Sequence, residues 1–414
     1  MDTGYVNKVW PHDQISVSGW IPWAVFGSGI GYLAWGNVGS LLWLWLLPFA
    51  FGRASSRSAA YALMLGYYLA GARGLPAGAA VFFGEAAPWW YGAVLWIGAS
   101  ALLALPFGLL WSDDVKRRGL RFLVALAIVA VPPLGLIGWC SPLAAAGALF
   151  PGLGWIGLVA TAGLMAWISM ARLSVDQAVV MVLIGGMVGL ICNIEALIAS
   201  PAAPTHWRGM DTEFPRLSSG GHDDAGQLLA SMQRIRWIKD LAATVPAGET
   251  RVLPETVLGP LGGLAEFQLQ QAEQALEARG SRLVVGAEVP QPDGRYINAL
   301  VVLGSTTVKR PIIAQGIPVP VAMWNPFGRN GAVADLWGRS AVVDLGGTRV
   351  GGLICYEQLL PWPIFQRVVA RPSVLLAVSN VWWARGTVIP AIQRQTVHAF
   401  ARLFSLPVIA ATNT

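Results

Sequence analysis

The chain has 414 residues, of which 55% are hydrophobic and only 12% are charged. This balance is unfavourable for a protein that is soluble throughout its length. The net charge of +6 does not indicate nucleic-acid binding, because the basic residues form no patch with interleaved aromatic residues. The three cysteines, Cys140, Cys192 and Cys355, are too scattered to predict a disulfide framework.

Long apolar blocks fill the first half of the chain. Most approach the roughly 20 residues that a helix needs to cross a bilayer. We place seven of them, at residues 15–35, 38–52, 58–72, 88–111, 122–139, 146–171 and 177–199. The sequence therefore predicts an N-terminal multispanning α-helical membrane domain of about seven helices over residues 1–200.

The basic residues between these blocks predict the orientation of that domain. Lys and Arg resist translocation and therefore remain in cytoplasmic loops. Only Arg73 falls in the loops of one side, whereas the loops of the other side hold Lys8, Arg53, Arg57, Lys116, Arg117, Arg118, Arg121 and Arg172. We therefore expect a cytoplasmic N-terminus, and we expect everything after residue 200 to lie outside. The polar stretch 1–14 does not read as a signal peptide, so we expect the chain to insert intact.

A second domain follows an abrupt change in composition. Residues 201–226 are rich in proline, glycine, serine and acids, and we interpret them as a connecting segment. Strand-like runs then alternate with helical patterns, and these runs occupy residues 251–255, 281–289, 296–304, 340–357, 373–380 and 406–412. This alternation predicts an α/β domain over residues 227–414.

Three residues at or beyond the ends of these strands carry complementary chemistry. Glu255 ends RVLPE, Lys309 follows YINALVVLG, and Cys355 ends TRVGGLIC. In open α/β sheets, reactive groups collect at the carboxyl ends of strands. A thiol near its ordinary pKa of about 8.5 needs a base or a cation to become a good nucleophile. Glu255 can take the proton and Lys309 can hold negative charge, although packing roles remain open for all three residues.

Two other kinds of site are disfavoured by the sequence. Nothing orients His12, His206, His222 or His398 against Cys355, as a cysteine and histidine enzyme would require. No cysteine and histidine pair has the spacing of metal ligands, and no phosphate-binding glycine pattern occurs. We therefore expect neither a metal nor a cofactor.

Several stretches together resemble the nitrilase (carbon–nitrogen hydrolase) superfamily. They are LPETVLG around Glu255, Lys309 after a strand, GLICYE around Cys355, VSNVWW at 378–383 and the terminal ARLFSLPVIAATNT. The match covers about residues 245–414. A multispanning N-terminal half is what the membrane branch of that superfamily carries, which includes apolipoprotein N-acyltransferase and conjugal transfer proteins of the TraB type.

This resemblance implies a four-layer α-β-β-α sandwich with a Glu, Lys and Cys triad. Glu255 would be the general base and acid, Lys309 the oxyanion stabiliser and Cys355 the nucleophile that forms a thioester. Glu357 would either assist this site or make a structural hydrogen bond.

The implied protein is a membrane-bound N-acyltransferase or amidase of the bacterial inner membrane that serves plasmid conjugal transfer, with its nitrilase-like domain in the periplasm. Its substrates would be a phospholipid or lipidated acyl donor and an amine acceptor, and its partner proteins are unknown. The alternatives are a small-amide hydrolase of the same fold and a non-catalytic membrane scaffold of the conjugation machinery.

The sequence departs from the acyltransferase pattern in two places. In the acyltransferase, one loop carries a further glutamate. The corresponding stretch of this chain reads AQGIPVPVAMW at 314–324, where Gln315 is the only polar side chain. This stretch looks more like the conjugal transfer branch. The chain also ends just after ATNT, so we expect the sandwich to end short of its final strands.

Two further features connect the site with lipid. Trp and Tyr prefer the bilayer interface, and the loops after the catalytic strands hold Trp324, Trp362, Trp382 and Trp383. We expect these loops to face the outer leaflet, with core packing as the alternative. Glu195 is the only acid within the apolar blocks, and it is either functional or within reach of water.

Overall fold

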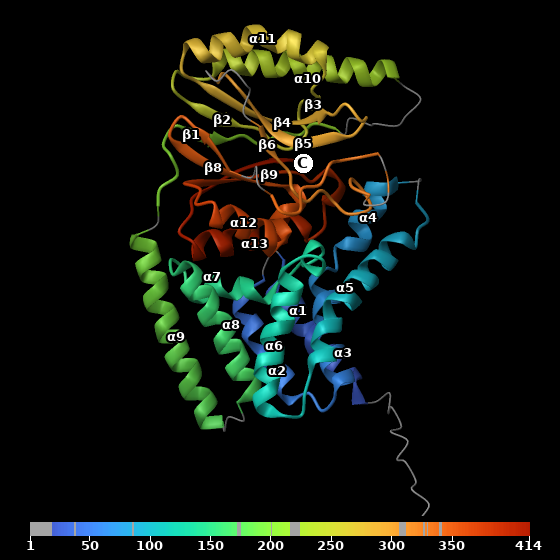
Figure 1. Cartoon of the computed structure of the whole chain (residues 1–414), viewed down its shortest axis with the longest axis vertical. Coiled ribbons are helices and arrows are strands. Elements are labelled where there is room, and N and C mark those ends of the chain that lie inside the picture. The colour runs from blue at the N-terminus through green and yellow to red at the C-terminus, as the bar shows by residue number, and fades with distance from the viewer. Residues whose placement is uncertain are drawn as a thin grey trace, which may run out of the picture.

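The computed structural model describes residues 19–36, 39–84, 87–171, 175–199, 201–215, 224–305, 312–325, 328, 330–338 and 342–414. The predicted site residue Lys309 lies outside these ranges, as do Lys8 and Arg172 of the basic loops. A helical half and a layered half are stacked end to end (Figure 1).

The described residues between 19 and 199 form a bundle of helices (Figure 1). The bundle consists of α1 (Ile21–Ala34), the 3-10 helix η2 (Leu41–Trp45) that continues into α2 (Leu46–Arg53), α3 (Arg57–Gly71), α4 (Leu75–Phe83), α5 (Tyr91–Leu110), α6 (Val115–Ala130), α7 (Ala145–Leu149), α8 (Gly154–Met170) and α9 (Val175–Ile198).

Within the described ranges, one helix is both long and apolar enough to cross a membrane, namely α5. Four apolar helices are shorter, namely Ile21–Ala34, Leu41–Arg53, Gly154–Met170 and Leu183–Ile198. The prediction of about seven helices of spanning length was therefore wrong. Proline and glycine explain part of the difference, because Pro132 and Pro133 follow the end of α6, and the turn at Pro151 and Gly152 divides the block 146–171 into α7 and α8.

Glycines bring α1 and α3 into close contact. A Cβ added to Gly27 of α1 would lie 1.9 Å from the carbonyl oxygen of Leu63, and one added to Gly66 of α3 would lie 2.1 Å from that of Ala24. Small residues at such positions let helix backbones approach closely, which is how helices associate where the hydrophobic effect is weak.

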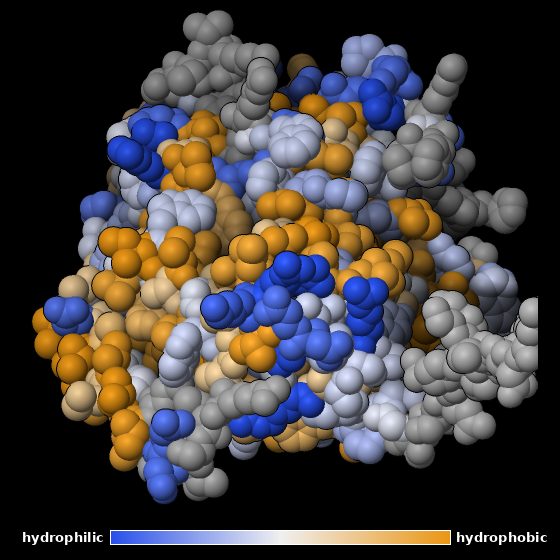
Figure 2. All heavy atoms as spheres, turned by 60° about the horizontal axis from the view of Figure 1, so that its bottom comes forward, coloured by the Kyte–Doolittle hydropathy of each residue, from blue (hydrophilic) through white to orange (hydrophobic). Residues whose placement is uncertain are grey.

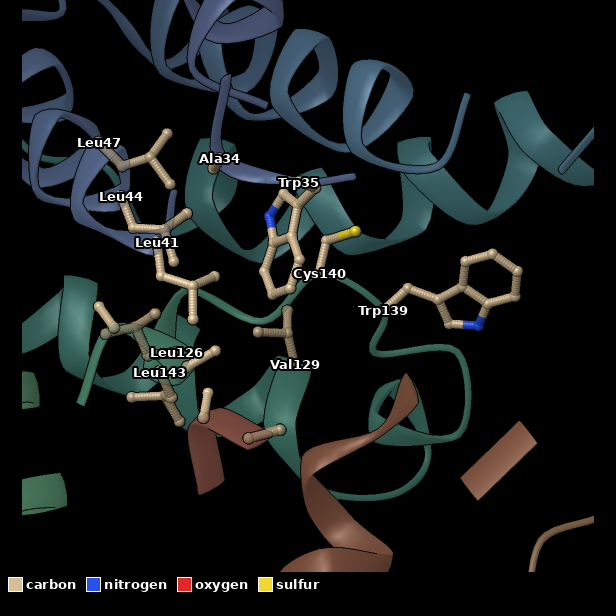
Figure 3. Packing of buried hydrophobic residues seen from close by; sticks show 14 of the residues in the cluster. Ala34, Trp35, Leu41, Leu44, Leu47, Leu126, Val129, Trp139, Cys140 and Leu143 are labelled. Carbon is tan, nitrogen blue, oxygen red and sulfur yellow. The ribbon is translucent and has the colours of Figure 1, made fainter. Parts of the chain in front are cut away.

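A buried aromatic cluster closes the bundle next to the layered half. Trp35 is fully buried, and its Nε1 donates to the hydroxyl of Tyr67 at 2.9 Å. That hydroxyl in turn donates to the carbonyl oxygen of Cys140. Figure 3 shows Trp35 beside Cys140, in the buried cluster that also contains Leu44 and Leu143. Cys140 is therefore a packing residue.

Large apolar side chains cover the outside of the helical half. Figure 2 shows hydrophobic residues over much of this surface, with a compact hydrophilic group between them. The most exposed include Val25, Leu109, Leu120, Ile156, Val159, Leu183, Leu197 and Ile198, with exposed fractions of 61% to 82%. An apolar surface of this extent requires an apolar partner or solvent.

The second half is an α-β-β-α sandwich, as the family resemblance implies (Figure 1). One sheet has the order β1 (Trp207–Gly209), β2 (Thr250–Val252), β4 (Arg282–Pro290), β5 (Tyr296–Leu303) and β6 (Ile312–Ala314), and β3 (Gly259–Pro260) also pairs with β4. The other has the order β10 (Val408–Asn413), β9 (Val374–Asn380), β8 (Thr348–Ile354) and β7 (Val342–Leu345).

Two helices cover each outer face of this sandwich. Figure 1 places α10 (Asp224–Thr244) and α11 (Gly263–Ala278) on the outside of the first sheet. It places α12 (Pro361–Val369) and α13 (Ile389–Leu403) between the second sheet and the helical half. The segment 201–226, interpreted from sequence as a connector, supplies β1, which pairs in parallel with β2.

Parallel pairing brings three strand ends to one edge of the second sheet. β9 lies between β8 and β10 and pairs in parallel with both. Asn380 is paired with Asn413, and Ile354 with Val378. Side chains that follow β8 and β9 therefore emerge close together, as expected for the carboxyl ends of parallel strands.

Candidate active site

Cys355 occupies a sharp turn at the end of β8. It begins the 3-10 helix η6 (Cys355–Leu359), and its φ is +49°, a left-handed conformation that is uncommon for a residue with a side chain. Such strain persists only where the surroundings enforce it, and it concentrates at functional sites. Gln393 of α13 contributes to this support, since its Nε2 donates to the carbonyl oxygen of Cys355 at 3.1 Å.

Glu255 follows β2 and meets Cys355 from the opposite sheet. The thiol and the carboxylate lie close enough for each to shift the pKa of the other, and Cys355 Sγ is 4.0 Å from the carbonyl oxygen of Asn380. Glu255 Oε1 accepts from Asn298 Nδ2 at 2.7 Å, and Oε2 accepts from the backbone N–H of Asn380 at 3.0 Å. The carboxylate is 4% exposed and the thiol 3%, so both are held in a fixed and largely dry position.

Burial sets the protonation of this pair. It raises the pKa of Glu255 to about 7, although the nearby thiol of Cys355 and the hydrogen bonds from Asn298 and Asn380 act in the opposite direction. Burial also raises the pKa of Cys355 well above its ordinary value, and the charge of Glu255 raises it further. The resting thiol is therefore neutral, and its carboxylate neighbour has the near-neutral pKa that suits a general base.

Gln315 and Asn298 connect the carboxylate to the backbone beneath the thiol. Asn298 Nδ2 also donates to Gln315 Oε1 at 2.8 Å, and Gln315 Nε2 donates to the carbonyl oxygen of Ile354 at 2.9 Å. Both amides are 1% exposed. Within the part of the chain that the structure describes, Asn298 Oδ1 has no hydrogen-bond partner.

The side chain of Glu357 makes hydrogen bonds that hold the surrounding backbone and Arg367 in place. Its Oε1 accepts from the N–H groups of Gly316 and Ile317 and from Arg367 Nη2, the last at 2.6 Å. Its Oε2 accepts from the N–H of Ile354 at 3.1 Å. Neither charged side chain of the Glu357 and Arg367 pair is exposed. Of the two roles expected for Glu357, the structural one accounts for all these contacts.

The helical half touches the site on one side through α4. Trp382, two residues after Asn380, stacks on Phe82 with 6.2 Å between ring centroids and 20° between planes. Trp383 meets the same Phe82 ring edge-on at 5.9 Å. These two tryptophans therefore pack against the helical half.

A second contact joins η6 to the turn after α6. The hydroxyl of Tyr356 donates to the carbonyl oxygen of Leu136 at 2.8 Å. An apolar cavity of about 150 Å³ adjoins this contact. Its walls come from α3, α5, the turn 137–140 and the loop 319–321, and they include Tyr68, Leu103, Trp139, Val319 and Tyr356.

Comparison with known proteins identifies the family. No family model matches the chain. The conjugal transfer protein TraB of Agrobacterium fabrum is 35% identical over 406 residues, which cover 93% of this chain and 90% of the relative. The "Probable conjugal transfer protein TraB" of Sinorhizobium fredii is 36% identical over 397 residues, which cover 93% and 96%. The chain belongs to the TraB family of conjugal transfer proteins.

Solved structures resemble this TraB-family chain over about half of its length. An amidase from Nesterenkonia sp. is 14% identical with a TM-score of 0.32, and the match covers 51% of this chain and 78% of the amidase. A mutant of the Nesterenkonia AN1 amidase from the nitrilase superfamily is 16% identical with a TM-score of 0.31, and the match covers 52% and 79%.

The structure brings together two of the three residues expected to form the site of this TraB-family protein. Glu255 and Cys355 lie together, while Lys309 falls within residues 306–311, which lie outside the described residues. Sequence reasoning missed Asn298 and Asn380. A polar residue inside the apolar run YINALVVLG was the only signal for Asn298.

Proposed function

We propose that this TraB-family protein is a membrane-bound thiol enzyme of the nitrilase type that transfers an acyl group from a lipid to an amine. The observation that carries the proposal is the buried pair of Cys355 and Glu255, which lie beside Asn380 at the edge where β8 and β9 end. A strained cysteine beside a carboxylate of near-neutral pKa has the chemistry of an activated nucleophile.

The proposed reaction has two halves. Cys355 Sγ attacks the carbonyl carbon of the donor while its proton passes to Glu255. Glu255 then protonates the leaving alcohol, and the acyl group remains on Cys355 as a thioester. An amine attacks the thioester, its proton passes to Glu255, and that proton returns to the departing sulfur. Lys309 is proposed as the group that stabilises the oxyanion in both halves.

The apolar cavity beside Tyr356 favours a substrate with an apolar acyl group over a small amide. Its wall is shared by the helical half and by the loop 319–321 of the sandwich. An acyl chain in a cavity of this kind is bound by removal of its methylene groups from water, about 0.8 kcal/mol for each. A small amide gains little from such a wall.

Membrane placement is the other part of the proposal. It is supported by the spanning length of α5, by the exposed apolar surface of the helical half and by the asymmetric distribution of basic loops. The proposed arrangement has a cytoplasmic N-terminus and a periplasmic sandwich at the bacterial inner membrane. The lipid donor then reaches Cys355 from the outer leaflet.

The test is to trap the thioester. Full-length protein in detergent is incubated with phospholipid, and its intact mass is measured before and after hydroxylamine, which cleaves thioesters. We expect one acyl mass on the wild type and on Cys192→Ser, and none on Cys355→Ala. Transfer to an added amine then separates a transferase from a hydrolase, which releases free acid. Unchanged conjugation with Cys355→Ala and Cys355→Ser would favour a non-catalytic scaffold and overturn the proposal.

A further inference from the structure

Helix α13 carries a stripe of basic residues at the boundary between the two halves. Arg394, His398 and Arg402 are four residues apart, so they share one face of the helix. At 1.5 Å per residue the stripe is roughly 12 Å long. All three residues are exposed, whereas Gln393, on the buried side of α13, supports the backbone of Cys355.

An open hollow of about 370 Å³ lies at one end of the stripe. Arg394 and His398 line it together with Gly36 and Gly39 of the turn after α1. Gln395 fixes this turn, because its Nε2 donates to the carbonyl oxygens of Ala34 and Gly39 at 2.8 and 3.2 Å. The hollow is therefore formed by a fixed junction between the helical half and α13.

A second hollow of about 190 Å³ lies at the other end. His398 and Arg402 line it together with Ala196 and Leu197 near the end of α9. Arg402 Nη2 donates to the Oδ1 of Asn193, which is a neutral acceptor. His398 thus lies between two hollows, each bordered by an arginine.

The positive charge of the stripe is not neutralised by the described part of the protein. Among the described residues, none forms an ion pair with Arg394, His398 or Arg402. The nearest acid along α9 is the exposed Glu195. Partial burial lowers the pKa of His398, and the charges of Arg394 and Arg402 lower it further.

The helix α9, which borders the second hollow, exposes apolar residues at the same level. Leu197 is 78% exposed and Ile198 is 82% exposed, and Ile194, one turn earlier, is 48% exposed. Cationic groups on the sandwich side and aliphatic groups on the helical side match a ligand with an anionic head and apolar tails. Guanidinium groups bind phosphate oxygens in a bidentate manner.

We propose that Arg394, His398 and Arg402 bind the phosphate of an anionic phospholipid whose acyl chains lie against α9 and the helical half. The inference rests on the proposed membrane placement. The lipid at this stripe contacts the helix that supports Cys355, and it is separate from the acyl donor. It fixes the sandwich at a set distance from the bilayer.

Native mass spectrometry of the full-length protein in detergent tests this site. Phosphatidylglycerol is titrated against wild type, against Arg394→Gln/Arg402→Gln, and against Arg236→Gln/Lys239→Gln, which removes two charges from α10 in the outermost layer. We expect the stripe variant to bind phosphatidylglycerol about tenfold more weakly, equivalent to about 1.4 kcal/mol. We expect the α10 control to bind as wild type does, and phosphatidylcholine to show no difference between variants.

Three outcomes would overturn the inference. The first is equal phosphatidylglycerol binding by all variants. The second is displacement of the lipid by excess inorganic phosphate, which would indicate a site for a soluble anion. The third is release of wild type from membranes by carbonate, which would remove the membrane placement as well. Thioester formation measured on the same variants separates the proposals, because the stripe variant is expected to acylate Cys355 normally.

Discussion

The amide of Asn298 holds the carboxylate of Glu255, with 2.7 Å between Asn298 Nδ2 and Glu255 Oε1. The same Nδ2 donates to Gln315, which in turn donates to the carbonyl oxygen of Ile354, the residue before Cys355. Two buried amides therefore connect the proposed base to the backbone that positions the proposed nucleophile. Substitution of Asn298 should change the protonation of Glu255 more than it changes the fold.

Replacement of this residue, Asn298→Leu, should slow acylation most at low pH. The hydrogen bond from Asn298 lowers the pKa of Glu255, so its loss leaves less carboxylate to accept the thiol proton. We expect thioester formation at pH 6 to fall about tenfold, since a hydrogen bond to a charged group contributes roughly 1.5 kcal/mol. The matched control Asn193→Leu, in α9, should keep the wild-type pH profile. A uniform loss at every pH would contradict this positioning role.

The buried Glu255 should also make stability depend on pH. Its pKa is about 7 in the folded protein against an ordinary 4.5. Below pH 4.5 both states are protonated. Between pH 4.5 and 7 the folded state binds more protons than the unfolded state, so stability falls as pH rises, and above pH 7 the full cost remains.

This cost is on the order of 3 kcal/mol at most, from 1.36 kcal/mol for each pKa unit. Glu255→Gln should therefore abolish acylation and flatten the fall in melting temperature between pH 4.5 and 7. Thermal unfolding in detergent at several pH values measures this. If the melting temperatures of the variant and the wild type depend on pH in the same way, the pKa of Glu255 is not the cause of the pH dependence.

The ion pair of Glu357 and Arg367 should stabilise the protein without taking part in the reaction. Removing one partner of a buried pair leaves an uncompensated charge and costs about 3 to 5 kcal/mol. We expect Arg367→Met to lower the melting temperature and Glu357→Gln/Arg367→Met to recover part of the loss. Acylation of Cys355 per folded molecule, measured by intact mass, should remain near wild type in the double variant. A complete loss there would assign Glu357 to the reaction.

Close packing of α1 on α3 should tolerate no side chain at Gly27. An added Cβ would lie 1.9 Å from the carbonyl oxygen of Leu63, so the helices must separate. We expect Gly27→Ala to destabilise the protein by roughly 1 to 3 kcal/mol. Gly29→Ala, on the same helix with no atom within 4 Å, is the matched control and should be neutral. Equal melting temperatures for both variants would exclude the close contact.

Sequence patterns were sufficient for an α/β domain and for part of the site, and the family resemblance implied the sandwich. Cys355 and Glu255 were identifiable because a nucleophile and an acid ended predicted strands, and the packing of the two sheets face to face brings them together. Asn298 was not identifiable, because a single polar residue in an apolar strand reveals a buried partner only when the opposite sheet is known. Arg367 was equally hidden, since an arginine in a short amphipathic helix normally faces solvent.

In the helical half, prediction from sequence was limited in a different way. Its apolar blocks coincide with helices, but hydropathy did not predict where helices stop. Proline pairs and glycine turns shorten them, and glycines such as Gly27 serve packing that depends on a neighbouring helix. The strand β1 escaped notice because three residues in a polar segment carry no recognisable alternation.

The bond from Tyr356 to Leu136 and the stacking of Trp382 on Phe82 have a practical consequence. The turn that bears the thiol and the segment that follows Asn380 each contact residues from the helical half. A fragment that begins after residue 200 would lose both contacts at once, and the turn that bears the thiol would be held only by contacts within the sandwich, such as that with Gln393. The helical half therefore helps to hold the proposed active site in place, so the sandwich cannot be studied alone without weakening that site.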